Sequence, residues 1–247
     1  MKSINNYISE KLVINRNTYY IYFPKTKEEL QDIIEKRITK DGNECNLNDI
    51  DVSNITDMSK LFKESKFNGN ISNWNVSNVE NMQEIFMHSN FNQDISEWDV
   101  SNVKNMSYMF YDSKFNQDIS SWDVSNVENM QEMFYASEFN KNISKWDVSN
   151  VTNMYGMFSS STFNQDISNW DVSNVKTMEG MFTFSKFNKD ISSWDVSNVE
   201  DMEHMFYCSK FNQDISKWKI NKKCNIYNIF YHSLLKGKEH KWWGRTK

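Results

Sequence analysis

The chain has 247 residues and a formal net charge of −5, and 15% of its residues are aromatic. The acidic balance argues against a general nucleic-acid binder, which is normally basic, and the aromatic content argues against a disordered chain. No run of about 18 apolar residues occurs in the sequence, so we expect no helix that spans a membrane.

Residues 1–50 are predicted to form an N-terminal cap. Residues 11–23 are interpreted as a β-hairpin with a turn near Asn15, Arg16 and Asn17. Thr26 and Glu29 have the spacing of a capping box, which predicts a helix that ends near Gly42. One face of this helix would carry four apolar residues: Leu30, Ile33, Ile34 and Ile38.

From residue 51 onward, the motif DVSN and its variants recur every 24 residues. The copies begin at Asp51, Asn75, Asp99, Asp123, Asp147, Asp171 and Asp195. These seven uninterrupted copies, residues 51–218, predict a solenoid in which each copy forms one coil. A degenerate eighth copy begins at Lys219, and residues 219–247 are interpreted as a C-terminal cap with a basic tail. Trp242 and Trp243 in this tail are predicted to pack over the last coil, with contact to an anionic membrane or nucleic acid as the alternative.

The copy at residues 123–146 illustrates the elements expected within one coil. The pattern I-x-x-W-x-V at residues 143–148 alternates in polarity, which predicts a short parallel strand. Val127, Met130 and Phe134 have helical spacing, which predicts a short helix. The expected fold class is therefore α/β: a leucine-rich-repeat-like solenoid of short parallel strands and short helices, with a hairpin-helix cap and a C-terminal cap.

Several polar positions never vary across the seven copies, among them those of Asn126, Ser137 and Asn140 in the copy at residues 123–146. A polar residue that recurs inside a repeat usually satisfies the backbone groups of turns. We therefore expect ladders of hydrogen bonds that connect one coil to the next.

The repeat unit FNQDISxWDVSNVxNMxxMFxxSx resembles the BspA-like surface-protein repeats, a branch of the leucine-rich-repeat group found in bacterial lipoproteins and adhesins. The resemblance covers residues 51–218. It implies a leucine-rich-repeat-like solenoid that serves in protein binding or adhesion, and it implies no enzymatic activity.

Localisation is predicted from the N-terminus and the cysteines. The first residues lack the apolar stretch of a signal peptide, and Cys45, Cys208 and Cys224 form no paired framework. These features favour the cell interior, whereas the family resemblance makes surface display the alternative.

Candidate partner-binding residues are those that vary between copies and combine aromatic rings with charge. They are Tyr111, Tyr135, Phe184, Tyr207, Glu84 and Glu132. Tyrosine anchors with a polar rim are typical of protein interfaces, although the same pattern fits sequence drift on a solvated face. The hypothesis that follows is a monomeric, non-enzymatic scaffold that binds another protein and no nucleic acid.

A row of aspartates is the second candidate site. Five consecutive copies begin with Asp: Asp99, Asp123, Asp147, Asp171 and Asp195. Stacked like charges are destabilising unless turn amides, Ser hydroxyls or lysines hold them, or unless a divalent cation binds. The alternative function is therefore a structural or divalent-cation-binding rod.

The search for catalytic groups favours a protein that is not an enzyme. The four histidines lie at unrelated places, and none of the motifs HExxH, P-loop, GxSxG or GxGxxG occurs. We expect no catalytic residues and no cofactor.

Overall fold

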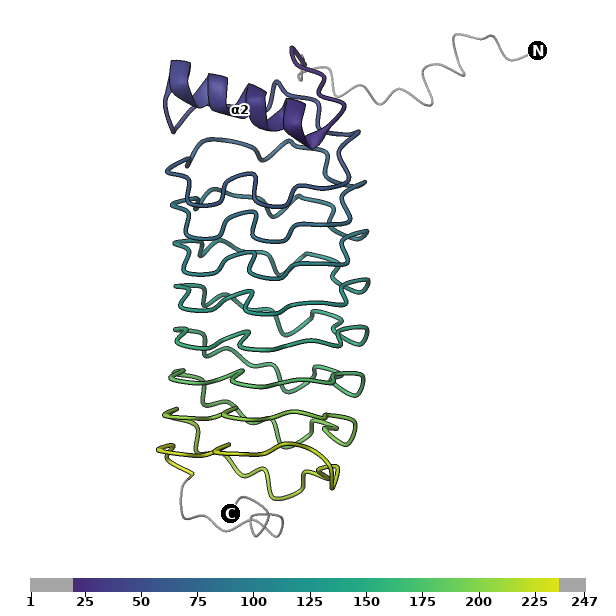
Figure 1. The fold of residues 1–247 in the computed structure, drawn as a ribbon, viewed down its shortest axis with the longest axis vertical. Coiled ribbons are helices and arrows are strands. Elements are labelled where there is room, and N and C mark those ends of the chain that lie inside the picture. Colours follow the sequence, from purple (N-terminus) through teal and green to yellow (C-terminus); the bar gives the residue numbers. More distant parts are fainter. Residues whose placement is uncertain (1–19, 236–247) are drawn as a thin grey trace, which may run out of the picture.

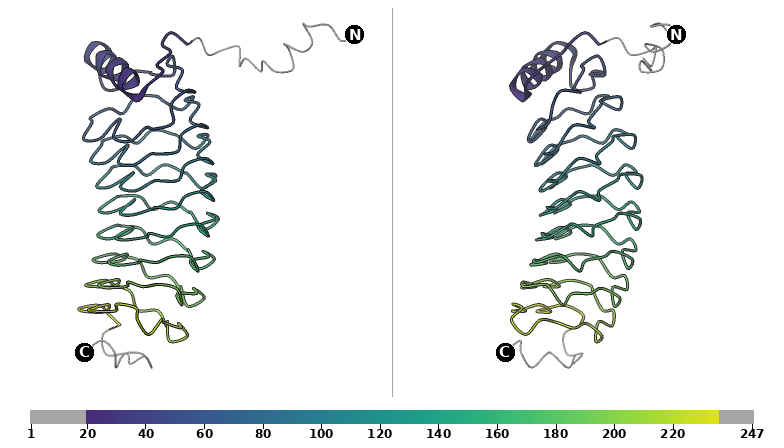
Figure 2. Two further views of the ribbon diagram at one scale, coloured as in Figure 1. Left: turned by 45° about the vertical axis from the view of Figure 1, so that its right-hand side comes forward. Right: turned by 90° about the vertical axis from the view of Figure 1, so that its right-hand side faces the viewer.

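The computed structural model describes residues 20–235, which form a column of stacked coils with one helix at the N-terminal end (Figure 1). Two further views show the coils lying one above another in chain order (Figure 2). Each coil is one 24-residue copy, so residues 24 apart in the sequence lie side by side. We number the positions of each coil 1–24 from the residue equivalent to Asp123, which places Trp146 at position 24.

Helix α2, Lys27–Asp41, lies where the capping box predicts it. The Thr26 hydroxyl accepts a hydrogen bond from the Glu29 N–H at 3.3 Å, and Gly42 is the C-cap with a φ of 86°. The Glu29 carboxylate accepts from the N–H of Lys25 instead of the N–H of Thr26, so half of the expected capping box forms. With 15 residues and a polar composition, α2 is not a membrane-spanning helix, and the described residues contain no other helix.

Helix α2 covers the N-terminal end of the column. Leu30 and Ile34 are buried and belong to the same apolar core as the coils. On the rim of this contact, Arg37 pairs with Asp49 at 2.7 Å. The helix thus shields the apolar surface that the first coil would otherwise expose.

Two predictions about the chain ends fall wholly or largely outside the described residues. They are the hairpin over residues 11–23 and the packing of Trp242 and Trp243. The last four residues of the predicted hairpin are described, and Tyr22 among them forms a parallel bridge with Ile50.

The predicted fold class is wrong. Within residues 20–235 the coils contain neither the helices nor the strands of an α/β, leucine-rich-repeat-like solenoid. Backbone bridges between coils are isolated parallel ones at position 7, such as that between Asn129 and Asn153. The rest of each coil consists of tight turns and short extended links.

Consecutive turns replace the helix predicted over residues 127–134. The N–H groups of Met133 and Tyr135 donate to carbonyls three residues earlier, whereas those of Glu132 and Phe134 donate to the next coil at 2.8 and 3.0 Å. Glu132 has a φ of 47°, in the left-handed region that a right-handed helix excludes. The turns bury the same apolar residues that one face of a helix would bury, so the spacing alone does not distinguish the two.

Turns also replace the strand predicted around Trp146. The Trp146 N–H donates to the Ile143 carbonyl at 3.2 Å, and the Val151 N–H donates to the Val148 carbonyl at 2.9 Å. The link between these turns is too short to form a ladder with neighbouring coils. Its residues still alternate between buried and exposed, with Trp146 and Val148 in the core and Asp147 outside, because the link lies directly on the core.

Aromatic ladders that run along the column form much of the core. At position 12, from Phe62 to Phe230, successive ring centroids are 5.6–5.9 Å apart. At position 17 the spacing is 6.2–6.3 Å. Each Trp at position 24 is buried and donates from Nε1 to a carbonyl of the preceding coil, as Trp146 does to Ile119 at 3.1 Å. Each inner Phe ring at positions 12 and 17 therefore lies between its copies in the two adjacent coils.

The predicted ladders between coils are confirmed at the Asn126 and Asn140 positions, whereas the Ser137 position bonds within its own coil. Asn126 Nδ2 donates to a carbonyl of the preceding coil at 2.8 Å. The Asn140 N–H donates to Oδ1 of Asn116, its equivalent one coil earlier, at 3.0 Å. The Ser137 hydroxyl is buried and accepts from the N–H two residues later at 3.1 Å. These bonds satisfy turn groups that have no partner in a helix or sheet.

Candidate functional site

Positions 9, 10, 13 and 14 of the coils form one continuous outward face of the column. The turns direct Met130, Met133 and Phe134 into the core, where they are buried, and leave Glu132 and Tyr135 partly exposed. Because equivalent residues stack, the side chains at one position form a row along the column. Variation at these four positions therefore reshapes the surface while the core stays the same.

Small residues in two successive coils leave a groove in this face. Gly156 and Gly180 occupy position 10, and Ser159 and Thr183 occupy position 13, where neighbouring coils carry larger side chains. The groove has a volume of about 710 Å³. Both glycines have a φ near +60°, at 57° and 60°, so they also suit the left-handed backbone of position 10.

Aromatic rings form the two ends of the groove. Tyr111 and Tyr135 stack with their centroids 4.5 Å apart on the N-terminal side, and Tyr207 and Tyr231 stack at 5.5 Å on the C-terminal side. Phe184 meets Tyr207 edge to face at 5.5 Å and remains 58% exposed. The groove thus offers ring faces and edges to a ligand.

Two carboxylates line the groove between these rings. The Glu132 side chain lies over Gly156, and burial raises the pKa of Glu132. Burial also raises the pKa of Glu179, and the nearby carboxylates of Asp201 and Glu203 add to this rise. The lining contains no Lys or Arg among the described residues, and its one histidine, His204, acts against the rise in the pKa of Glu179. The groove is therefore an acidic and aromatic recess.

The groove brings together five of the six residues predicted to bind a partner. They are Tyr111, Glu132, Tyr135, Phe184 and Tyr207. They come from coils 3, 4, 6 and 7 and meet on one face because the coils stack in register.

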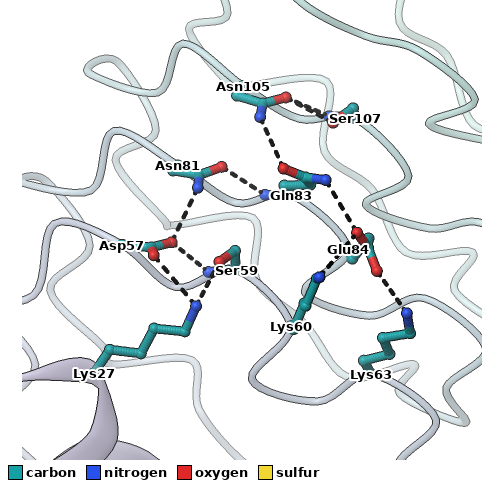
Figure 3. Close-up of polar contacts among 10 residues, drawn as sticks. All are labelled: Lys27, Asp57, Ser59, Lys60, Lys63, Asn81, Gln83, Glu84, Asn105 and Ser107. Carbon is teal, nitrogen blue, oxygen red and sulfur yellow. Dashed lines mark hydrogen bonds and ion pairs between the residues drawn. The ribbon is translucent and has the colours of Figure 1, made fainter.

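Glu84, the sixth predicted residue, lies outside the groove. Figure 3 shows its carboxylate between two lysines of the preceding coil, with Lys63 Nζ at 2.7 Å and Lys60 Nζ at 3.6 Å. Burial would raise the pKa of Glu84, but the hydrogen bond from Lys63 and the charges of both lysines lower it below its ordinary value. This carboxylate therefore serves a contact within the column.

The aspartates of the predicted metal row hold turns. Each accepts a hydrogen bond at Oδ1 from the N–H two residues later, at 3.0 or 3.1 Å: Asp99, Asp123, Asp147, Asp171 and Asp195. Hydrogen bonds from Ser125 lower the pKa of Asp123. In coil 2, Asn75 makes the same bond without a charge. Residues 20–235 contain no group of three or more His, Cys, Asp or Glu placed to hold a metal ion.

Nine residues that line the groove were not among the predicted site residues: Tyr155, Gly156, Ser159, Glu179, Gly180, Thr183, His204, Asn228 and Tyr231. The available signal was the scarcity of glycine, because two of only six glycines occupy the same position in successive copies. A glycine at such a position marks a special backbone conformation or a close approach. Here it marks both.

Comparison with known proteins places the chain in a family. No curated protein and no solved structure matches the chain. One family model, described as "Mycoplasma protein of unknown function, DUF285", matches residues 30–141 and 135–243. These two matches cover most of the chain and follow its repeats, so the chain belongs to the DUF285 family of repeat proteins.

Proposed function

We propose that the chain is a non-enzymatic scaffold that binds another protein through the groove between Tyr135 and Tyr207. The observation that carries this proposal is the interruption of the outward face in coils 5 and 6. Gly156, Gly180 and Ser159 replace large side chains there, while the core beneath keeps its residues. Recesses walled by tyrosine are where partner side chains anchor in protein interfaces.

The repeat unit gives a second line of support. Its resemblance to the BspA-like surface-protein repeats implies protein binding or adhesion as the role of the chain. The alternative of a structural or divalent-cation-binding rod lacks comparable support, because Asp123 and its equivalents already use a carboxylate oxygen in their turns.

Filling the groove tests the proposal. The double variant Ser159→Tyr/Thr183→Tyr introduces at position 13 the residue that coils 3, 4, 7 and 8 carry there, so the backbone is known to accept it. The variant and the wild-type chain would be immobilised and exposed to an extract of the cells that produce the protein. Proteins retained by the wild type would then be purified and their affinity measured by calorimetry.

The matched control is Met87→Tyr, which adds the same side chain at position 13 of coil 2, outside the groove. We expect a purified partner to bind the wild type and the control equally and to lose at least about tenfold in affinity for the filled variant, because the recess has closed. Equal retention by all three proteins, each shown to melt like the wild type, would refute the proposal.

A further inference from the structure

The carboxylates of the groove lack the lysine partners that four other glutamates of the column have: Glu80, Glu84, Glu138 and Glu200. Along the column, Glu residues pair with Lys residues of adjacent coils, as Glu80 does with Lys104 at 2.8 Å. Within residues 20–235, no Lys or Arg lies within ion-pair distance of Glu132 or Glu179. Both carboxylates are partly buried, and their pKa values are raised, unlike that of the paired Glu84.

This charge distribution restricts the chemistry of a partner. A neutral or anionic segment that covers the groove would remove the water that solvates Glu132 and Glu179. It would supply no interaction of equal strength in return, so its binding would cost free energy. A cationic side chain would restore the lost interactions through charge-assisted hydrogen bonds.

The shape of the groove restricts the partner further. The lining extends from Tyr111 in coil 3 to Tyr231 in coil 8, which is five coil spacings. At roughly 4.8 Å per spacing this corresponds to about 24 Å, the length of about seven residues of extended polypeptide. Gly156 and Gly180 lie near the middle of that length, with the Glu132 side chain over Gly156 and open space above Gly180.

We infer that the partner presents a Lys or Arg side chain, carried on an extended polypeptide segment, to the carboxylates of Glu132 and Glu179 in this groove. The inference rests on the proposed function and names the chemistry that the groove recognises. The cation occupies the space above Gly180, between the two carboxylates, and the tyrosine pairs at both ends contact the flanking residues of the segment.

Two matched probes test the charge requirement. One is a fluorescently labelled heptapeptide with alternating Gly and Arg, and the other is the same peptide with citrulline, which keeps the shape of Arg without its charge. We expect the wild-type chain to bind the arginine peptide at least about tenfold more tightly. Glu132→Gln/Glu179→Gln should abolish that preference. The control Glu128→Gln/Glu200→Gln removes the same charge from two exposed glutamates outside the groove and should keep the preference.

Equal binding of the two peptides by the wild type, or an equal loss in the control, would overturn the inference. A neutral oligosaccharide that binds the wild type but not Tyr135→Ala, while neither peptide binds, would assign the groove to a glycan instead. The captured partner separates this inference from the proposed function. If Ser159→Tyr/Thr183→Tyr abolishes binding of the captured partner and Glu132→Gln/Glu179→Gln does not, the inference of a cationic side chain is wrong and the proposed scaffold function is supported. If Ser159→Tyr/Thr183→Tyr has no effect on binding, the proposed scaffold function is wrong.

Discussion

The side chain of Glu132 lies so close to Gly156 that a Cβ atom added to the glycine would come within 2.8 Å of Glu132 Cγ. These two residues are 24 apart in the sequence and occupy the same position in adjacent coils. The glycine thus provides the space into which the carboxylate of the preceding coil folds. This contact underlies both the depth of the groove and the burial of its acidic group.

The two glycines of the groove differ in what a methyl group would meet, which permits a matched comparison. Gly156→Ala and Gly180→Ala both place alanine at a φ near +60°, which costs about 1–2 kcal/mol in each case. A Cβ at residue 180 would make only an ordinary contact, 3.5 Å from Thr183 Oγ1. We expect Gly156→Ala to lose about 1 kcal/mol more stability than Gly180→Ala, because it alone displaces Glu132. Denaturant unfolding measures the difference, and equal losses would contradict the contact.

The aromatic ladder predicts a large cost for removing one ring. Phe134 is fully buried, and its ring lies 5.7 Å from those of Phe110 and Phe158 in the adjacent coils. Phe134→Ala should therefore reduce the free energy of unfolding by about 3–5 kcal/mol. The adjacent Tyr135→Ala, on the outward face, is the control and should cost much less. A loss below about 1 kcal/mol for Phe134→Ala would mean that the ring does not belong to the core.

Removal of the acceptor at Asp123 tests whether the aspartate row holds turns. Asp123→Asn keeps the oxygen that accepts from the Ser125 N–H, as Asn75 does in coil 2, so at pH 7 we expect it to lose only the contribution of the charge. Asp123→Ala removes the acceptor and should cost about 1 kcal/mol. Equal stability of the two variants would contradict the role in the turn.

The same residue predicts a dependence on pH. Hydrogen bonds from Ser125 lower the pKa of Asp123 in the folded state, so its charge stabilises the fold fully above the unfolded value of about 3.9. That contribution is lost as the pH falls from about 3.9 through the lower folded pKa. The advantage of the wild type over Asp123→Ala should therefore shrink in this acidic window and stay constant above it. Added calcium should leave the melting temperature unchanged, whereas an upward shift would favour the cation-binding rod.

The contribution of the Glu132 carboxylate to stability should show the opposite dependence on pH. Burial raises the pKa of Glu132 in the folded state, so its ionisation favours the unfolded chain. Above the folded pKa the full penalty applies, and below the unfolded value of about 4.3 it vanishes. Glu132→Gln should therefore melt at a higher temperature than the wild type at pH 7, and this advantage should disappear by about pH 4. Glu128→Gln, at an exposed site outside the groove, should show no such gain, and an equal gain in both variants would contradict the burial of Glu132.

Part of the candidate site could be predicted from the sequence because its residues combine variability with aromatic rings. Tyr111, Tyr135 and Tyr207 stand out where other copies carry unrelated residues, and all three line the groove. The hollow between them was not predictable in this way. It arises because Gly156 and Gly180 come to lie next to each other only when the coils stack.

The sequence by itself determined the period of the column, the set of buried side chains and helix α2. An apolar residue that recurs every 24 positions must meet its own copy, whatever the local conformation of the chain, so Phe134 and Trp146 were bound to be buried. Helix α2 was equally predictable, because Thr26 and Gly42 are local signals at its two ends.

Only the tertiary structure decided the path of the backbone within each coil. Glu132 and its equivalents adopt a left-handed conformation that such residues disfavour in isolation. The Glu132 N–H donates to the next coil at 2.8 Å, and this bond between coils offsets the local cost. No pattern within one copy records a hydrogen bond to the next copy. For this reason the apolar spacing predicted a helix and a strand where the structure has consecutive turns.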